Sequence, residues 1–189
     1  MVDDMKNMER TLVLIKSDAI ERGLTEEIIK RYISSGLRVV AKKTVDVDRD
    51  LAENHYLDTE SQIVGMGNKT LQAAKEAGTL ENIKKIFGTE DPKKIGLKLH
   101  EWMIELITSA PSIAMVLEGE EAVQKARRIT GYTDPSKAEK GTIRGDFGND
   151  SISRANEERR ATKTLVHASG SKEEAEREIK LWFKPDELK

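Results

Sequence analysis

The chain has 189 residues, of which 35% are charged, and its 34 acidic and 32 basic residues give a formal net charge of −2. A chain of this length buries roughly 70% of its unfolded surface, so it can form one domain with a substantial core. The near-balanced charge argues against binding to nucleic acid or an acidic membrane through bulk charge. Any anion site must therefore be a local cluster of Lys and Arg.

The absence of cysteine excludes disulfides, thiolate metal sites and cysteine nucleophiles, and it favours an intracellular location. The first ten residues are charged throughout and do not resemble a signal peptide. No apolar run approaches the roughly 20 residues that a membrane span requires. We therefore expect a cytoplasmic protein with no membrane partner.

The first predicted element is a strand over Thr11–Lys16, whose apolar residues occupy both faces. Thr25 is placed to cap a helix that ends at Gly36. The apolar side of that helix is formed by Ile28, Ile29, Tyr32 and Ile33. Residues 37–47 alternate as a second strand, after which Asp48 can cap a short helix.

Residues 59–92 are interpreted as a surface insertion. They contain two short helix-like runs, Thr70–Ala77 and Thr79–Phe87, and a glycine follows each run. The run Gly65–Thr70 superficially resembles a phosphate-binding loop. It lacks the Gly-Lys-Thr order, the spacing and the preceding strand of such loops, so we reject that interpretation.

Asp91 and Pro92 have the pattern of an N-cap and first turn of a longer helix. The predicted buried face of this helix consists of Ile95, Leu99, Trp102, Met103 and Leu106. The short apolar run Ser112–Leu117 is the best candidate for a central strand. Glu120–Thr130 is predicted to be helical.

The polar residues 148–163 are interpreted as a second surface insertion. A further strand is expected near Leu165, and Ser171 opens a capping box at the start of the last helix. The inward face of that helix is formed by Ala175, Ile179, Trp182 and Phe183. This order of elements predicts a single α+β domain over residues 1–189, a ferredoxin-like sandwich of helices on a mostly antiparallel four-stranded sheet.

His167 is the residue best placed for chemistry, because Ala168 and Ser169 beside it leave space for a substrate. Histidine can act as a covalent nucleophile. Glu178 borders the apolar stripe of the last helix, where a carboxylate needs a partner. A hydrogen bond from His167 to Glu178 would fix the imidazole tautomer and leave the other nitrogen for attack. The alternatives, a structural His167 and a solvated Glu178, stay open, and His55 and His100 are interpreted as ordinary, partly exposed histidines.

Three cationic residues could meet a polyphosphate: Lys16 at a strand exit, Arg127 on a helix, and Arg144 in a loop between glycines. Arg128 should be the more solvent-facing member of its pair, because neighbours on a helix point about 100° apart. Thr133 adds a hydroxyl donor in a turn. Each residue alone is more often an ordinary surface residue, but their joint occurrence favours phosphoryl transfer through an imidazole.

In combination, these segments resemble the nucleoside diphosphate kinases. The resemblance covers nearly the whole chain outside the two insertions, and its most specific parts are Thr11–Asp18, Gly141–Phe147 and the run His167–Ser171. It implies that His167 becomes a phosphohistidine and that Ser169 and Glu178 orient it, with Lys16 also in the catalytic site. The residues that it assigns to nucleotide binding are Lys16, Tyr56, Leu99, Arg127, Thr133, Arg144 and Thr164.

The resemblance also implies a ping-pong transfer of the γ-phosphate from a nucleoside triphosphate, mainly ATP, to a nucleoside diphosphate, which would maintain nucleoside triphosphate pools. Mg²⁺ would bridge the phosphates of the nucleotide with few or no protein ligands. Broad tolerance of the base and a homo-oligomer, most often a hexamer, are further implications.

Two positions depart from the family pattern. Thr164 stands where the family usually has an asparagine, three residues before the histidine, and Leu99 aligns with an aromatic residue that stacks on the base. Threonine is a shorter donor, and leucine offers only apolar contact. We therefore expect weaker nucleotide binding with intact phosphoryl transfer.

Two other functions use the same scaffold. A regulatory or nucleic-acid-binding protein without kinase activity is disfavoured, because His167 stands together with Lys16, Arg127 and Arg144 and because the net charge is negative. A protein that donates phosphate from His167 to other proteins cannot be separated from the kinase by sequence.

Overall fold

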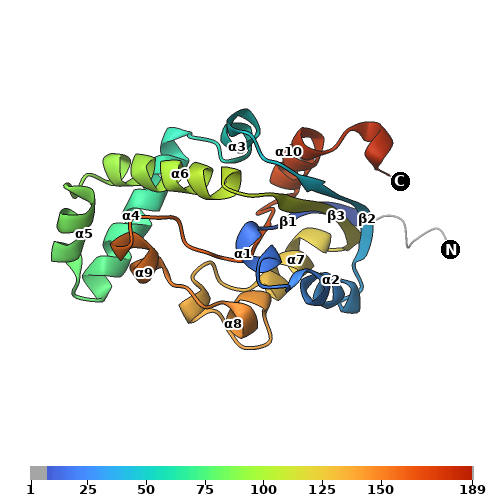
Figure 1. Cartoon of the computed structure of the whole chain (residues 1–189), viewed down its shortest axis with the longest axis horizontal. Coiled ribbons are helices and arrows are strands. Elements are labelled where there is room, and N and C mark those ends of the chain that lie inside the picture. Colours follow the sequence, from blue (N-terminus) through green and yellow to red (C-terminus); the bar gives the residue numbers. More distant parts are fainter. Residues whose placement is uncertain (1–7, 189) are drawn as a thin grey trace. The chain divides into compact units, whose positions relative to one another are not determined.

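The computed structural model describes residues 8–188, which form two compact units. The first unit contains the described residues up to Val47, then Ala110–Asp150, and then the residues from Lys163 onward. The second unit contains Asp48–Ser109 and Ser151–Thr162. Figure 1 labels the elements of both units.

The first unit is built on a four-stranded antiparallel sheet with the strand order β2-β3-β1-β4. The strands are β1 (Met8–Ile15), β2 (Arg38–Val45), β3 (Ser112–Glu120) and β4 (Val166–Ala168). The predicted sheet is confirmed, and so is the central position of the 112–117 run. All residues of β1 from Thr11 onward are buried, as expected for a strand covered on both faces.

The helices of this unit are α1 (Ser17–Ile20), α2 (Thr25–Ser34), α7 (Ala122–Thr130), α8 (Ile143–Phe147) and α10 (Lys172–Trp182), with 3₁₀ turns at Pro135–Lys137 and Pro185–Glu187. In Figure 1, α2 and α7 lie on one side of the strands and α10 lies on the other. A hydrophobic core cluster joins β1, β3 and β4 to α2 and α7. The predicted inward face of the last helix is confirmed, since Ala175, Ile179 and Trp182 of α10 are buried, and so is Phe183 directly after it.

Several helix boundaries differ from the predictions. Thr25 is the first residue of α2 rather than its cap, because Leu24 occupies the cap position without a side-chain hydrogen bond. Ile33 is 51% exposed and does not join the buried face. Glu120 ends β3, and Glu121 takes a positive φ of 50° before α7 begins at Ala122. The strand therefore runs further than its apolar residues indicate.

Ser171 caps α10 as predicted, and its side chain accepts a hydrogen bond from the N–H of Glu174. The carboxylate of Glu174 accepts from the N–H of Gly170 at 2.6 Å. The second half of the predicted capping box therefore closes one residue earlier than the usual pattern.

The second unit is helical. It contains α3 (Arg49–His55), α4 (Glu60–Glu76), α5 (Leu80–Phe87), α6 (Pro92–Thr108) and α9 (Ile152–Glu157). The predicted caps at Asp48 and Asp91 are confirmed. The predicted short helix Thr70–Ala77 is wrong, because a single helix runs from a cap at Thr59 through the glycines of the Gly65–Thr70 run. That run is helical, which confirms that it is not a phosphate loop.

The two predicted insertions contribute to a core and are more than surface excursions. Ala74, Ile83 and Ile95 form a buried cluster, and Phe87 and Leu99 pack against it. Residues 148–163 contribute α9, which contacts α5. On α6, Ile104 and Ile107 are fully buried, whereas the predicted core residues Leu99, Met103 and Leu106 are only half-buried.

Helices α4 and α6 cross at two glycines. A Cβ added at Gly67 would overlap the carbonyl of Pro92, and one added at Gly96 would overlap the carbonyl of Ile63. Gly65 lies on the same helix as Gly67 but has open space around its Cβ position. The glycines at these crossings permit close helix packing.

Replacing Gly67 by alanine is therefore expected to destabilise the protein by about 1–3 kcal/mol, because the helices must separate to admit a methyl group. The matched substitution Gly65→Ala should stabilise it by about 0.5–1 kcal/mol, because alanine favours the helix. Urea denaturation of both variants measures the difference. Equal effects would show that close packing at Gly67 does not matter.

None of the described helices is both long enough and apolar enough to span a membrane.

Candidate active site

The site in the first unit begins where β1 ends. Lys16 follows β1 directly and is 7% exposed, and its Nζ donates a hydrogen bond to Thr164 Oγ1 at 2.6 Å. Burial lowers the pKa of Lys16 to about 8, although Asp18 and Asp150 act in the opposite direction. Arg144 lowers this pKa further. The structure thus places a lysine whose charge is poorly solvated beside an arginine, an arrangement suited to an anion.

The backbone between Thr164 and Val166 makes a tight turn. The N–H of Val166 donates to the carbonyl of Thr164 at 2.7 Å, and Leu165 between them has a φ of +65°. A hydrogen bond between residues i and i+2 defines a γ-turn, and positive φ at its centre is strained for leucine. The turn is held from outside: Leu165 N–H donates to Asp18 Oδ2 at 2.9 Å, and its carbonyl accepts from the N–H of Lys16 at 2.9 Å.

Arg144 lies on the short helix α8, whereas the sequence predicted a loop. Its guanidinium donates to the carbonyls of Thr164 at 3.1 Å, Gly131 at 3.0 Å and Val166 at 2.7 Å. A Cβ at Gly145 would overlap the backbone of Glu139. Gly145 is therefore explained by close packing of the chain at this point.

His167 lies on β4, opposite Leu14 of β1. Its Nε2 lies 3.1 Å from both carboxylate oxygens of Glu178, whose side chain is 1% exposed. Ser169, fully buried, donates its hydroxyl to Glu178 Oε2 at 2.6 Å. The predicted pairing of Glu178 with His167 is present.

This arrangement determines the tautomer of His167. A carboxylate accepts hydrogen bonds, so the ring proton lies on Nε2 and the lone pair of the neutral imidazole lies on Nδ1. The side chain of His167 is 20% exposed. The ring can therefore present a nucleophilic nitrogen while a buried carboxylate stabilises any positive charge that develops.

The other predicted phosphate ligands of this unit lie on its surface. Arg127 and Thr133 are exposed, and Arg128 is exposed as well, so the expected contrast between the two arginines is not observed. Arg127 Nη1 would lie 3.4 Å from a Cβ added at Gly170, which places this guanidinium near the start of α10. Among the described residues, Arg127 makes no ion pair.

Two predicted nucleotide contacts, Tyr56 and Leu99, belong to the second unit. The carbonyl of Tyr56 lies 2.7 Å from Nε2 of the half-buried His100, and its ring packs 4.6 Å from the ring of His55. His55 is 2% exposed, so the prediction of a partly exposed residue is wrong for His55. Leu99 packs against the core cluster of its own unit.

Sequence reasoning assigned no role to Asp18, Leu165 or Asp150. Asp18 is 5% exposed, and Asp150 is 7% exposed and accepts from the N–H of Lys163 at 2.8 Å. This bond joins the two ends of the segment 151–162. The sequence shows only that Asp18 stands two residues after the strand-terminal Lys16, and it does not indicate that Asp18 is buried.

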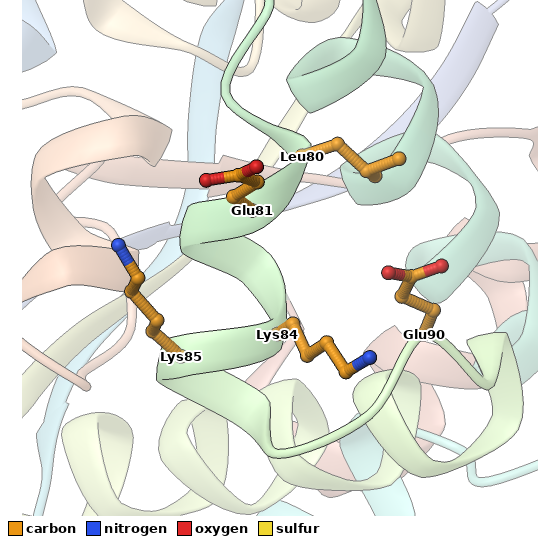
Figure 2. A pocket seen from close by; sticks show the side chains of 5 residues that line it. All are labelled: Leu80, Glu81, Lys84, Lys85 and Glu90. Carbon is orange, nitrogen blue, oxygen red and sulfur yellow. The ribbon is translucent and has the colours of Figure 1, made fainter.

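A shallow hollow on the second unit is lined by Leu80, Glu81, Lys84, Lys85 and Glu90 (Figure 2). Its charges are of both signs, and none of the predicted site residues lines it. We assign no chemistry to this hollow.

A family model described as nucleoside diphosphate kinase matches residues 9–98 and 93–188. The nucleoside diphosphate kinase of Pyrobaculum aerophilum is 41% identical over 181 residues, which cover 96% of this chain and 98% of that protein. The enzyme of Pyrococcus furiosus is 40% identical over 184 residues, which cover 97% and 88% of the two chains.

Solved structures agree with these matches. The crystal structure of an NDP kinase from Pyrobaculum aerophilum has a TM-score of 0.90, with 41% identity over 96% of this chain and 98% of that one. A transition-state mimic of the nucleoside diphosphate kinase of Borrelia burgdorferi, with bound vanadate and ADP, has a TM-score of 0.75. It is 30% identical and covers 97% of this chain and 91% of that one.

Proposed function

Because the chain belongs to the nucleoside diphosphate kinase family, we propose that it transfers the γ-phosphate of a nucleoside triphosphate, mainly ATP, to a nucleoside diphosphate through a phosphohistidine at His167. The observation that carries this proposal is the bond of His167 Nε2 to the buried Glu178. It directs the lone pair of the ring to Nδ1, the nitrogen that would attack phosphorus.

The proposed reaction has two half-reactions. Nδ1 forms a bond to the γ-phosphorus while the bond to the bridging oxygen breaks, and the nucleoside diphosphate leaves with that oxygen. A terminal oxygen of a second nucleoside diphosphate then attacks the phosphohistidine, and Nδ1 leaves with its electron pair. The proton stays on Nε2 throughout, hydrogen-bonded to Glu178, and the carboxylate offsets the positive charge of the phosphorylated ring.

Phosphoryl transfer depends on placement and charge neutralisation more than on acid or base catalysis. In our proposal, Lys16 and Arg144 contact the phosphates that react, and the exposed Arg127 and Thr133 complete the phosphate contacts. Tyr56 and Leu99 are proposed to contact the base and the adjoining part of the nucleotide. Thr164 would contribute to nucleotide binding mainly through its bond to Lys16.

Mg²⁺ is proposed as the cofactor, held by the phosphates of the nucleotide. The groups around Thr164 suit this arrangement, because Lys16 and Arg144 are cations that match phosphate oxygens rather than a metal. The carboxylates of Asp18 and Asp150 already accept from backbone N–H groups. When bound, Mg²⁺ would neutralise charge on the phosphates.

We extend the proposal to the whole chain as a single kinase domain over residues 1–189 that supplies nucleoside triphosphates in the cytoplasm. We also propose a homo-oligomer, most simply a hexamer. Light scattering would then give six times the 21.2 kDa of one chain. A mass of one chain at micromolar concentration would contradict it.

The experiment that tests the function uses ATP labelled in the γ-phosphate, with Mg²⁺. Wild-type protein should acquire acid-labile label, and addition of unlabelled GDP to the isolated phosphoprotein should release labelled GTP. His100→Ala should still acquire the label, whereas His167→Ala should not. Absence of label from folded wild-type protein would remove the proposal. Label that passes to another protein but not to GDP would favour the protein phosphate donor.

Lys16 gives the proposal a pH dependence. With a pKa of about 8, the ammonium is mostly protonated at pH 7 and mostly neutral at pH 9. The phosphate contact is lost with the charge, so kcat/KM should fall as pH rises through about 8, chiefly through KM. Lys16→Arg keeps its charge over this range, so its profile should be flat there. If kcat/KM of Lys16→Arg falls over the same pH range as in wild type, the fall is caused by another titrating group.

A further inference from the structure

Asp18 is a buried carboxylate that is only half satisfied. Its Oδ2 accepts from the N–H of Leu165 at 2.9 Å, while Oδ1 is buried without a hydrogen-bond partner among the described residues 8–188. A buried carboxylate oxygen that lacks a hydrogen-bond donor costs stability. The cost indicates a role that an apolar residue could not fulfil.

One part of that role concerns the turn at Leu165. Positive φ costs free energy for leucine, and such a conformation persists only where neighbouring groups hold it. Asp18 Oδ2 and the N–H of Lys16 hold opposite ends of the Leu165 backbone. This γ-turn directs the carbonyls of Thr164 and Val166 toward the guanidinium of Arg144. Asp18 therefore fixes the groups that orient Arg144.

The second part of the role of Asp18 concerns the positive charge of Lys16. The charged groups that act on the ammonium of Lys16 are Asp18, Arg144 and Asp150, and Thr164 accepts its hydrogen bond. Asp18 makes the largest contribution in favour of the charged ammonium, against burial and against Arg144. Removal of that carboxylate leaves the ammonium of Lys16 and the guanidinium of Arg144 in a poorly solvated place, with only the smaller contribution of Asp150 to offset them.

We propose that Asp18 is a positioning residue for phosphoryl transfer, which stabilises the ammonium of Lys16 and holds the strained turn at Leu165 that orients Arg144. The inference rests on the proposed function. It adds a residue that contacts neither the nucleotide nor the reacting atoms.

Two substitutions separate the two parts. Asp18→Asn keeps an oxygen that can accept from Leu165 N–H but removes the charge, whereas Asp18→Ala removes both. Asp48→Asn is the matched control, since Asp48 also accepts from a backbone N–H, at 2.8 Å, but lies in the second unit. The profile of kcat/KM is measured for each variant between pH 6 and pH 9.5.

For Asp18→Asn, the alkaline limb should move down by about one pH unit or more, with kcat/KM at pH 6 within about threefold of wild type. Asp18→Ala should show the same displacement and, in addition, a fall in kcat of about tenfold. The Asp48→Asn profile should match wild type. An unmoved limb in Asp18→Asn would overturn the charge role, and an unchanged kcat per folded molecule in Asp18→Ala would overturn the turn role.

A readout without turnover separates this inference from the proposed function. NMR titration of ¹³C-labelled lysine side chains follows the Lys16 ammonium directly, with Lys16→Arg used to assign its signal. Its titration should occur at lower pH in Asp18→Asn than in wild type, whether or not the protein is a kinase. An identical titration would overturn the inference even if wild type is phosphorylated. If wild type carries no label but the titration moves, the function fails while the coupling of Asp18 to Lys16 stands.

Discussion

Arg144→Ala is expected to lower kcat/KM for nucleotide by about 10³-fold or more, because the substitution removes a charged phosphate ligand from the centre of the proposed site. It also leaves the carbonyls of Thr164, Gly131 and Val166 without their guanidinium donor. Part-buried carbonyls that lose a hydrogen-bond donor destabilise the fold, so we expect the free energy of unfolding to fall by about 1–3 kcal/mol. Steady-state kinetics and urea denaturation measure the two effects.

Arg144→Lys distinguishes charge from geometry. Lysine keeps the positive charge, but its single ammonium cannot reproduce a planar fork that reaches three carbonyls. We expect kcat/KM to recover only in part, by about tenfold relative to alanine. Arg128→Ala is the control for loss of one positive charge, since Arg128 is exposed and has no role in the proposed site. Comparable losses in Arg128→Ala and Arg144→Ala would contradict the assignment.

Glu178→Gln is expected to lower kcat by about 10–100-fold with little change in KM. Glutamine can keep the shape of the contact, but it cannot offset the positive charge that forms on the ring of His167. Its amide N–H₂ would also face His167 Nε2 and Ser169 Oγ, which both donate to a carboxylate oxygen in the native site. The rate of phosphohistidine formation, followed by rapid mixing with ATP, reports the effect directly.

Ser169→Ala is the companion variant, because it removes one hydrogen bond to Glu178 and leaves the carboxylate charged. We expect a smaller decrease in kcat, about tenfold or less. A loss in Glu178→Gln that appears in KM alone would contradict the orienting role of Glu178. A decrease in activity that is fully explained by a smaller fraction of folded protein would contradict this role as well.

Local sequence patterns predicted the sheet and most helices well. Alternating residues and short apolar runs located the strands, because side chains on a strand point alternately to its two faces. Asp48, Asp91 and Ser171 marked helix starts through their capping side chains. The patterns failed for α4, because a short helix was predicted over Thr70–Ala77, whereas α4 begins after Thr59 and runs through Gly65 and Gly67. Gly67 packs closely against the start of α6, and such packing between distant segments cannot be read from local sequence.

The candidate site was predictable where its contacts are close in sequence or follow helix geometry. Glu178 lies eleven residues after His167, and its place beside an apolar stripe indicated a partner. The bond between Lys16 and Thr164 joins residues 148 positions apart. The turn at Leu165 requires a positive φ, which the presence of a leucine does not indicate. Neither this turn nor the role of Asp18 could therefore be derived from the sequence.

The most direct test of the account is to locate the phosphate after incubation with ATP and Mg²⁺, by ³¹P NMR and peptide mapping under alkaline conditions. We predict a single phosphorylated imidazole at His167, with phosphorus on Nδ1, that disappears when GDP is added. Phosphate on His55 or His100, phosphorus on Nε2 of His167, or a phosphohistidine that GDP does not discharge would contradict the account.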